Sequence, residues 1–86
     1  MAFRHIVTLK RVIDQLYQKQ EEIEFIIGNY REKREAIEER AADMGRDMTE
    51  KEQDRWDRIG EAIDDLETEY DEIENAISYI SDFEEE

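Results

Sequence analysis

Few side chains in this sequence could carry catalytic chemistry. His5 is the single histidine and the chain has no cysteine, which excludes a thiol nucleophile, a disulfide framework and a zinc site of the usual kind. Di-iron helical bundles need a Glu-x-x-His motif on two helices, and no glutamate precedes His5. We therefore interpret His5 as a surface residue, and the sequence predicts neither an enzyme nor a bound cofactor.

Carboxylates are the chemical group in excess. The chain has 26 acidic and 12 basic residues and a net charge of −14. The acidic segment 64–72 lacks the glycine and the ligand spacing of an EF-hand loop, and it lies inside an expected helix, where ligands cannot converge. We therefore predict no metal site. The negative charge also argues against direct binding to nucleic acid or to anionic membranes.

Apolar residues recur with the period of paired helices. From Trp56 to Ile80 they alternate in steps of three and four residues, which is the spacing of coiled-coil a and d positions. This seam comprises Trp56, Ile59, Ile63, Leu66, Tyr70, Ile73, Ile77 and Ile80. A second seam runs from Ile6 to Met44 and is interrupted by the polar residues Gln20 and Arg34. The sequence therefore predicts an all-α protein.

The end of the first helix and the start of the second have clear signals. Gly45 can adopt the left-handed conformation that ends a helix, and Thr49 and Glu52 have the spacing of a capping box. The seam keeps its phase through Gly28-Asn29, which favours one continuous helix. The sequence does not decide whether this helix bends there. In a single domain 1–86 we predict a helix over 3–44, a turn over 45–48, a helix over 49–83 and a frayed acidic tail over 84–86.

A connection this short makes the two helices antiparallel neighbours. Folding the chain at residues 46 and 47 pairs positions whose numbers sum to about 93. The predicted layers are Ile37–Trp56, Arg34–Ile59, Tyr30–Ile63, Ile27–Leu66, Ile23–Tyr70, Gln20–Ile73, Leu16–Ile77 and Ile13–Ile80. Polar seam residues usually fix the register at a cost in stability, and this is our interpretation of Gln20 and Arg34.

An isolated hairpin covers each seam side chain from one direction only. Several residues that flank the seams are apolar or small. The start of the first helix is also expected to extend beyond the second helix. An exposed apolar cluster there would mark a contact surface. We therefore predict that two antiparallel hairpins pair into a four-helix bundle, as a homodimer. The candidate contact residues are Phe3, Ile6, Val12, Ile26, Ala62, Ala76 and Phe83.

The second helix is the acidic part of the chain. After Arg58 there are twelve acidic residues and no lysine or arginine. Like charges four residues apart, such as Asp65 and Glu69, destabilise a helix by roughly 0.2–0.5 kcal/mol per pair. Two interpretations stay open: a solvated face that keeps the protein in solution, and a binding surface for a basic partner. The candidate residues for that surface are Glu61, Asp64, Asp65, Glu67, Asp71 and Glu72, and Phe25 and Tyr79 are expected to face solvent as further contacts.

Two functional hypotheses follow. The first is a small acidic, non-catalytic protein that acts by protein–protein interaction, both with itself and with a partner protein. The second is an inhibitor that mimics nucleic acid and blocks a basic DNA- or RNA-binding site, by analogy with phage anti-CRISPR and anti-restriction proteins. Along the second helix the carboxylates average one per ~3.5 Å, close to the ~3.4 Å phosphate spacing of a DNA strand.

A membrane role is not expected. Residues 1–19 are basic and amphipathic, as in an interfacial membrane helix, but pairing with the second helix already explains their apolar face. No apolar segment approaches the ~18 residues that a membrane span needs. A cytoplasmic location is therefore the expectation.

Overall fold

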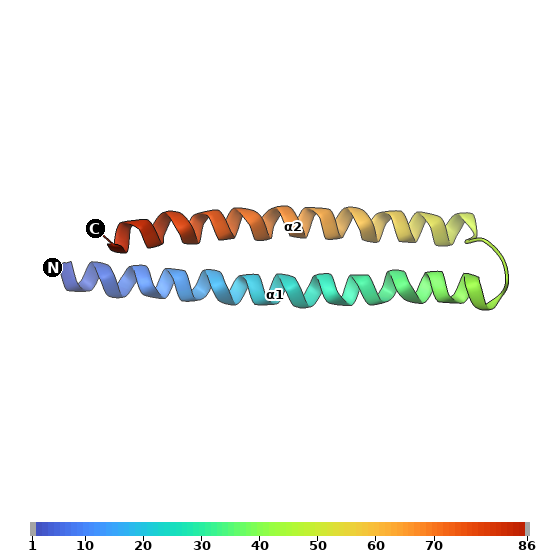
Figure 1. The fold of residues 1–86 in the computed structure, drawn as a ribbon, viewed down its shortest axis with the longest axis horizontal. Coiled ribbons are helices and arrows are strands. Elements are labelled where there is room, and N and C mark those ends of the chain that lie inside the picture. The colour runs from blue at the N-terminus through green and yellow to red at the C-terminus, as the bar shows by residue number, and fades with distance from the viewer. Residues whose placement is uncertain (1, 86) are drawn as a thin grey trace.

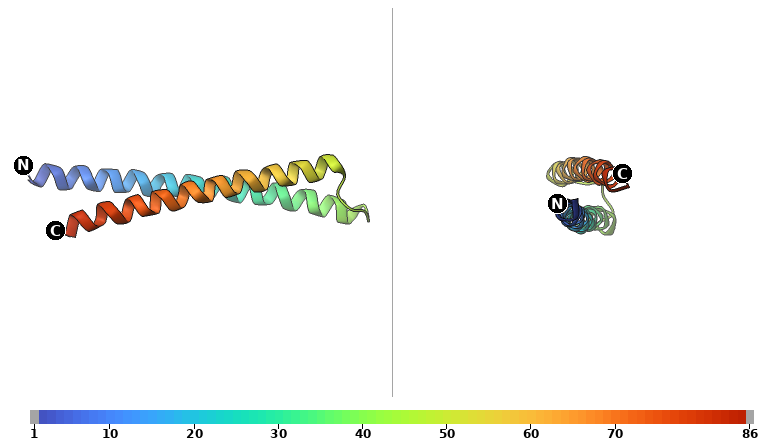
Figure 2. Two further views of the ribbon diagram at one scale, coloured as in Figure 1. Left: turned by 90° about the horizontal axis from the view of Figure 1, so that it is seen from above. Right: turned by 90° about the vertical axis from the view of Figure 1, so that its left-hand side faces the viewer.

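The computed structural model consists of two long helices, α1 (Ala2–Asp43) and α2 (Glu50–Glu85), packed against each other (Figure 1). It describes the backbone of residues 2–85 and the side chains of residues 9–82. The helices run antiparallel and cross at a shallow angle (Figure 2). Together they form a rod of 66 × 16 × 14 Å. The predicted all-helical hairpin is confirmed.

The helix ends lie within one or two residues of the predicted bounds, 3–44 and 49–83. α1 continues through Gly28 and Asn29, as the phase of the seam indicated. α2 continues to Glu85, two residues beyond its predicted end at Phe83. Glutamate is a good helix former, and neither glycine nor proline interrupts the end of this helix. At the open end of the hairpin, α1 projects beyond α2 (Figure 1), as predicted.

The core lies along the predicted seams. Ile23, Ile27, Ile63, Ile73 and Ile77 form one buried cluster. Half-buried side chains pack against it, namely Ile13, Leu16, Tyr30, Ile59, Leu66 and Tyr70. No side chain that the structure describes is completely buried. Two helices therefore make a continuous core, but one that solvent reaches from its edges.

Cross-helix contacts test the register. Lys19 Nζ lies 3.8 Å from Glu69 Oε1, and Arg31 Nη2 lies 3.2 Å from Glu67 Oε1. The residue numbers of these partners sum to 88 and to 98, on either side of the predicted 93. The two pairs flank the seam on opposite edges, and the mean of their sums is the 93 that the predicted register requires.

The turn uses both signals found in the sequence. Gly45 has a φ of +64°, and the N–H groups of Gly45 and Arg46 donate to the carbonyls of Ala42 and Ala41, which is a Schellman ending of α1. The Thr49 N–H donates to Glu52 Oε1 at 3.0 Å, and the Glu52 N–H donates to Thr49 Oγ1 at 3.2 Å. The predicted capping box is therefore confirmed, with Thr49 immediately before α2.

The capping box makes the stability of the hairpin depend on acid pH. The Thr49 N–H, and after it the Arg46 guanidinium at 2.7 Å, lower the pKa of Glu52 from 4.5 to about 2. A lowered pKa stabilises the fold above the ordinary value of 4.5, and this contribution is lost as the pH falls towards about 2.

We therefore expect Glu52→Gln to be less stable than the natural chain at pH 7, because glutamine keeps an acceptor oxygen but no charge. The difference between the two proteins should shrink as the pH falls from 4.5 towards about 2. Urea unfolding of both chains at each pH measures it. A difference that stays constant over this range would show that the carboxylate charge does not stabilise the turn.

Candidate interaction surfaces

The candidate sites of this structure are surfaces of the helix pair. Among the residues that it describes, no group of three or more histidine, cysteine or carboxylate side chains could hold a metal ion. Neither helix, over its described length, is long and apolar enough to cross a membrane. The side chain of His5 lies outside the described residues. Three surfaces remain: the two edges of the helix pair and the outer side of α2.

We call the first edge the g face. It carries Val12, Lys19, Ile26, Lys33, Arg40, Arg55, Ala62, Glu69 and Ala76. The Lys19–Glu69 ion pair shows that the rows from α1 and α2 meet along this edge. The same spacing sets Val12 beside Ala76 and Ile26 beside Ala62, so two apolar layers flank the ion pair. Ile26 is 40% exposed, and Val12, Ala62 and Ala76 are half-buried.

The structure describes the side chains of four of the seven predicted self-association residues. The g face brings together Val12, Ile26, Ala62 and Ala76. The side chains of Phe3, Ile6 and Phe83 lie outside the described residues. Close to the turn the g face becomes basic, and Lys33 Nζ there lies 5.6 Å from the centroid of the Tyr30 ring.

The net negative charge is concentrated on α2. α1 has eight basic and nine acidic residues, whereas α2 has three basic and fifteen acidic ones, which gives net charges of −1 and −12. Five predicted partner-binding acids are exposed and make no ion pair with a cation that the structure describes: Glu61, Asp64, Asp65, Asp71 and Glu72. The sixth, Glu67, is instead paired with Arg31 across the hairpin.

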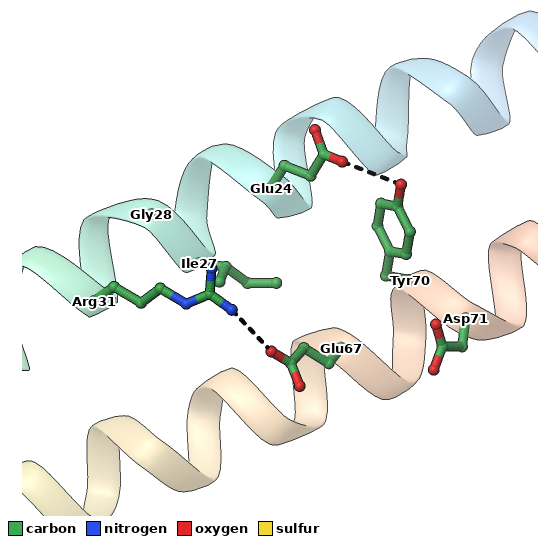
Figure 3. Close-up of a pocket in the computed structure, with 7 residues that line it drawn as sticks. All are labelled: Glu24, Ile27, Gly28, Arg31, Glu67, Tyr70 and Asp71. Carbon is green, nitrogen blue, oxygen red and sulfur yellow. Dashed lines mark hydrogen bonds and ion pairs between the residues drawn. The ribbon is translucent and has the colours of Figure 1, made fainter.

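The opposite edge, which we call the e face, contains an open hollow of about 510 Å³ (Figure 3). Its lining residues are Glu24, Ile27, Gly28, Arg31, Glu67, Tyr70 and Asp71. Tyr70 Oη donates to Glu24 Oε1 at 3.1 Å at one end, and the Arg31–Glu67 pair closes the other. Ile27, which is buried, supplies the apolar part of the lining.

The phenol of Tyr70 is held as a donor. Its hydrogen bond to the Glu24 carboxylate and its burial raise the pKa of Tyr70 above the ordinary value of 10.0.

Sequence reasoning missed this hollow on the e face. A signal was present, because Gly28 stands between Glu24 and Arg31 on the side of α1 that adjoins the e row of α2.

The polar seam residue Arg34 has a definite role in packing. Its guanidinium carbon lies 3.6 Å from the centroid of the Trp56 ring, whose Nε1 donates to Glu38 Oε1 at 2.9 Å. A Cβ at Gly60 would come within 3.3 Å of Arg34 Nη2, so the glycine leaves room for this side chain. Trp56 is half-buried, and Arg34 and Glu38 hold its indole at the edge of the core.

The two aromatic side chains that were predicted to face solvent are exposed. Phe25 is 71% and Tyr79 is 66% exposed.

Comparison with known protein families, with curated proteins and with solved structures gives no match to this chain. Any proposal about the function of this protein therefore rests on the geometry of the described surfaces.

Proposed function

We propose that this protein acts by protein–protein interaction, and that two hairpins pair through their g faces into a four-helix bundle. The supporting observation is that the hairpin exposes more surface than a compact monomer of the same mass. The hairpin has an accessible surface of 7186 Å² for a mass of 10.4 kDa. A compact monomer of this mass is expected to have about 5,400 Å².

The excess of about 1,800 Å² matches what a dimer removes, because obligate interfaces bury about 1,000–2,500 Å² on each subunit. The g face suits a second copy. Ile26 stands next to the small Ala62, which gives this face a protrusion beside a depression. A two-fold axis places the same surface on both partners, so the protrusion of one copy can fill the depression of the other.

We expect light scattering to give a dimer mass for the natural chain at about 100 µM, since pairing depends on protein concentration. Ile26→Glu should restore the mass of 10.4 kDa, because it places a carboxylate in the centre of the apolar contact. The matched control is Phe25→Glu. Phe25 is the adjacent residue, is 71% exposed and does not belong to the g row, so this variant should remain a dimer.

Two results would contradict pairing through the g face. One is a mass of 10.4 kDa for the natural chain at that concentration. The other is an equal loss of dimer in Phe25→Glu and Ile26→Glu, which would indicate a general effect of added negative charge.

A second candidate function rests on the outer side of α2. Its five exposed acids make no described ion pair, so their charge is available to a basic partner, including the nucleic-acid-binding site of another protein. An inhibitor that mimics nucleic acid would bind such a protein with an affinity that falls steeply with salt. Neutral amides at Asp64, Asp65 and Asp71 would abolish that binding, whereas the g-face contact would survive them.

A further inference from the structure

The three glycines of the chain have different physical explanations. Gly45 has a positive φ of 64°, and Gly60 leaves room for the Arg34 guanidinium. Gly28 has neither reason, because its φ is not positive and a Cβ there would meet no atom within 4 Å. Glycine inside a helix costs about 1 kcal/mol relative to alanine. In the structure Gly28 lines the hollow on the e face (Figure 3).

We infer that this hollow is a binding pocket for an arginine side chain of a partner protein, which would lie over Gly28 between α1 and α2. The inference rests on the proposed role in protein–protein interaction and names the chemistry of the partner. Carboxylates alone would not define a site. Here they surround a cavity of about 510 Å³ that has an apolar lining residue and an aromatic ring.

The chemistry of the lining residues suits a guanidinium. Three carboxylates and one cation line the hollow, so its net charge is negative. The Oε1 atoms of Glu24 and Glu67 are each engaged by one donor, which leaves their second oxygens for a ligand. Asp71 makes no described ion pair and lies beside Tyr70 on α2 (Figure 3). A planar guanidinium can bond to two such oxygens while it stacks on the Tyr70 ring.

The pocket is compatible with pairing of the hairpins. It lies on the e face, whereas the proposed four-helix bundle uses the g face on the opposite edge. A dimer would therefore present two such pockets on its outside. Because the two surfaces are separate, either one can fail experimentally while the other stands.

The test uses the full chain and N-acetyl-arginine methylamide as the probe, with the backbone amide signals of Ile27, Gly28 and Arg31 followed by NMR. These signals should shift in a saturable way, while the amide of Gly45 at the distant turn stays unchanged. The citrulline derivative has nearly the same shape without the charge and should cause no saturable shift. Light scattering on the same samples reports pairing independently.

Charge variants separate a pocket from general attraction to an acidic protein. Glu67→Gln and Asp71→Asn should each weaken binding of the arginine probe about tenfold. Glu61→Gln and Asp64→Asn change the net charge equally on the outer side of α2, and should weaken it by less than about twofold. Equal losses in the two sets would overturn the inference.

Gly28→Leu tests the cavity itself. A helical leucine leans towards the preceding turn, so it would fill the hollow next to Glu24 and remove binding of the probe. Ala42→Leu is the matched control, because Ala42 is exposed, has the same heptad position on α1 and lies far from the hollow. Circular dichroism checks that both variants stay helical. Undiminished binding to Gly28→Leu, or equal shifts with the arginine and citrulline probes, would overturn the inference.

Discussion

Ile23→Ala is expected to destabilise the hairpin by about 2–4 kcal/mol, because it leaves a cavity in the buried cluster. Ile23 is the most buried described residue of that cluster, with 3% of its surface exposed. A chain of 86 residues has a total stability of only about 4–13 kcal/mol. The loss is therefore a large share of the whole, and urea unfolding followed by circular dichroism measures it.

The matched control removes the same atoms from the same helix. Ile26 lies one turn further on and is 40% exposed, so Ile26→Ala should cost less than about 1 kcal/mol in the unpaired hairpin. The comparison belongs at a protein concentration low enough to keep the hairpins apart. A similar loss in both variants would mean that the core is not centred on the seam that contains Ile23.

The features that the sequence predicted correctly depend on local physics. Helix type follows from the period of the apolar residues, and the ends of the turn follow from Gly45, Thr49 and Glu52. The register then follows from the length of the connection, which sets the sum of paired residue numbers near the observed mean of 93. The end of α2 was less predictable, since no residue there has a preference strong enough to stop the helix.

The surfaces were only partly predictable, because they depend on where long side chains reach. Glu67 looked like a free surface acid, but Arg31 reaches it from the other helix. Arg34 lies in the seam as predicted, and the indole of Trp56 and the space above Gly60 accommodate its guanidinium, while its Nε is buried without a hydrogen-bond partner among the described residues. The hollow on the e face is lined by polar side chains and by Gly28, so the pattern of apolar residues alone does not predict it.

Replacement of Gln20 by leucine is expected to stabilise the hairpin by about 1–2 kcal/mol, in contrast to the loss expected for Ile23→Ala. Gln20 is buried, with 6% of its surface exposed, yet its Nε2 makes one long hydrogen bond of 3.4 Å to the Tyr70 carbonyl. That carbonyl also accepts the regular backbone bond inside α2, so it would not be left unsatisfied. Leucine would extend the apolar seam without leaving a buried polar group alone.

The gain in stability should come with a loss of specificity. A polar residue at an a position limits the registers and oligomers that a helical seam can form. Gln20→Leu should therefore unfold at higher urea and show a broader mass distribution by light scattering. Gln18→Leu, on the exposed side of α1, should change stability by less than about 0.5 kcal/mol. If Gln20→Leu were less stable than the natural chain, the bond to Tyr70 would contribute more than burial of leucine, and Gln20 would be a stabilising residue of the core.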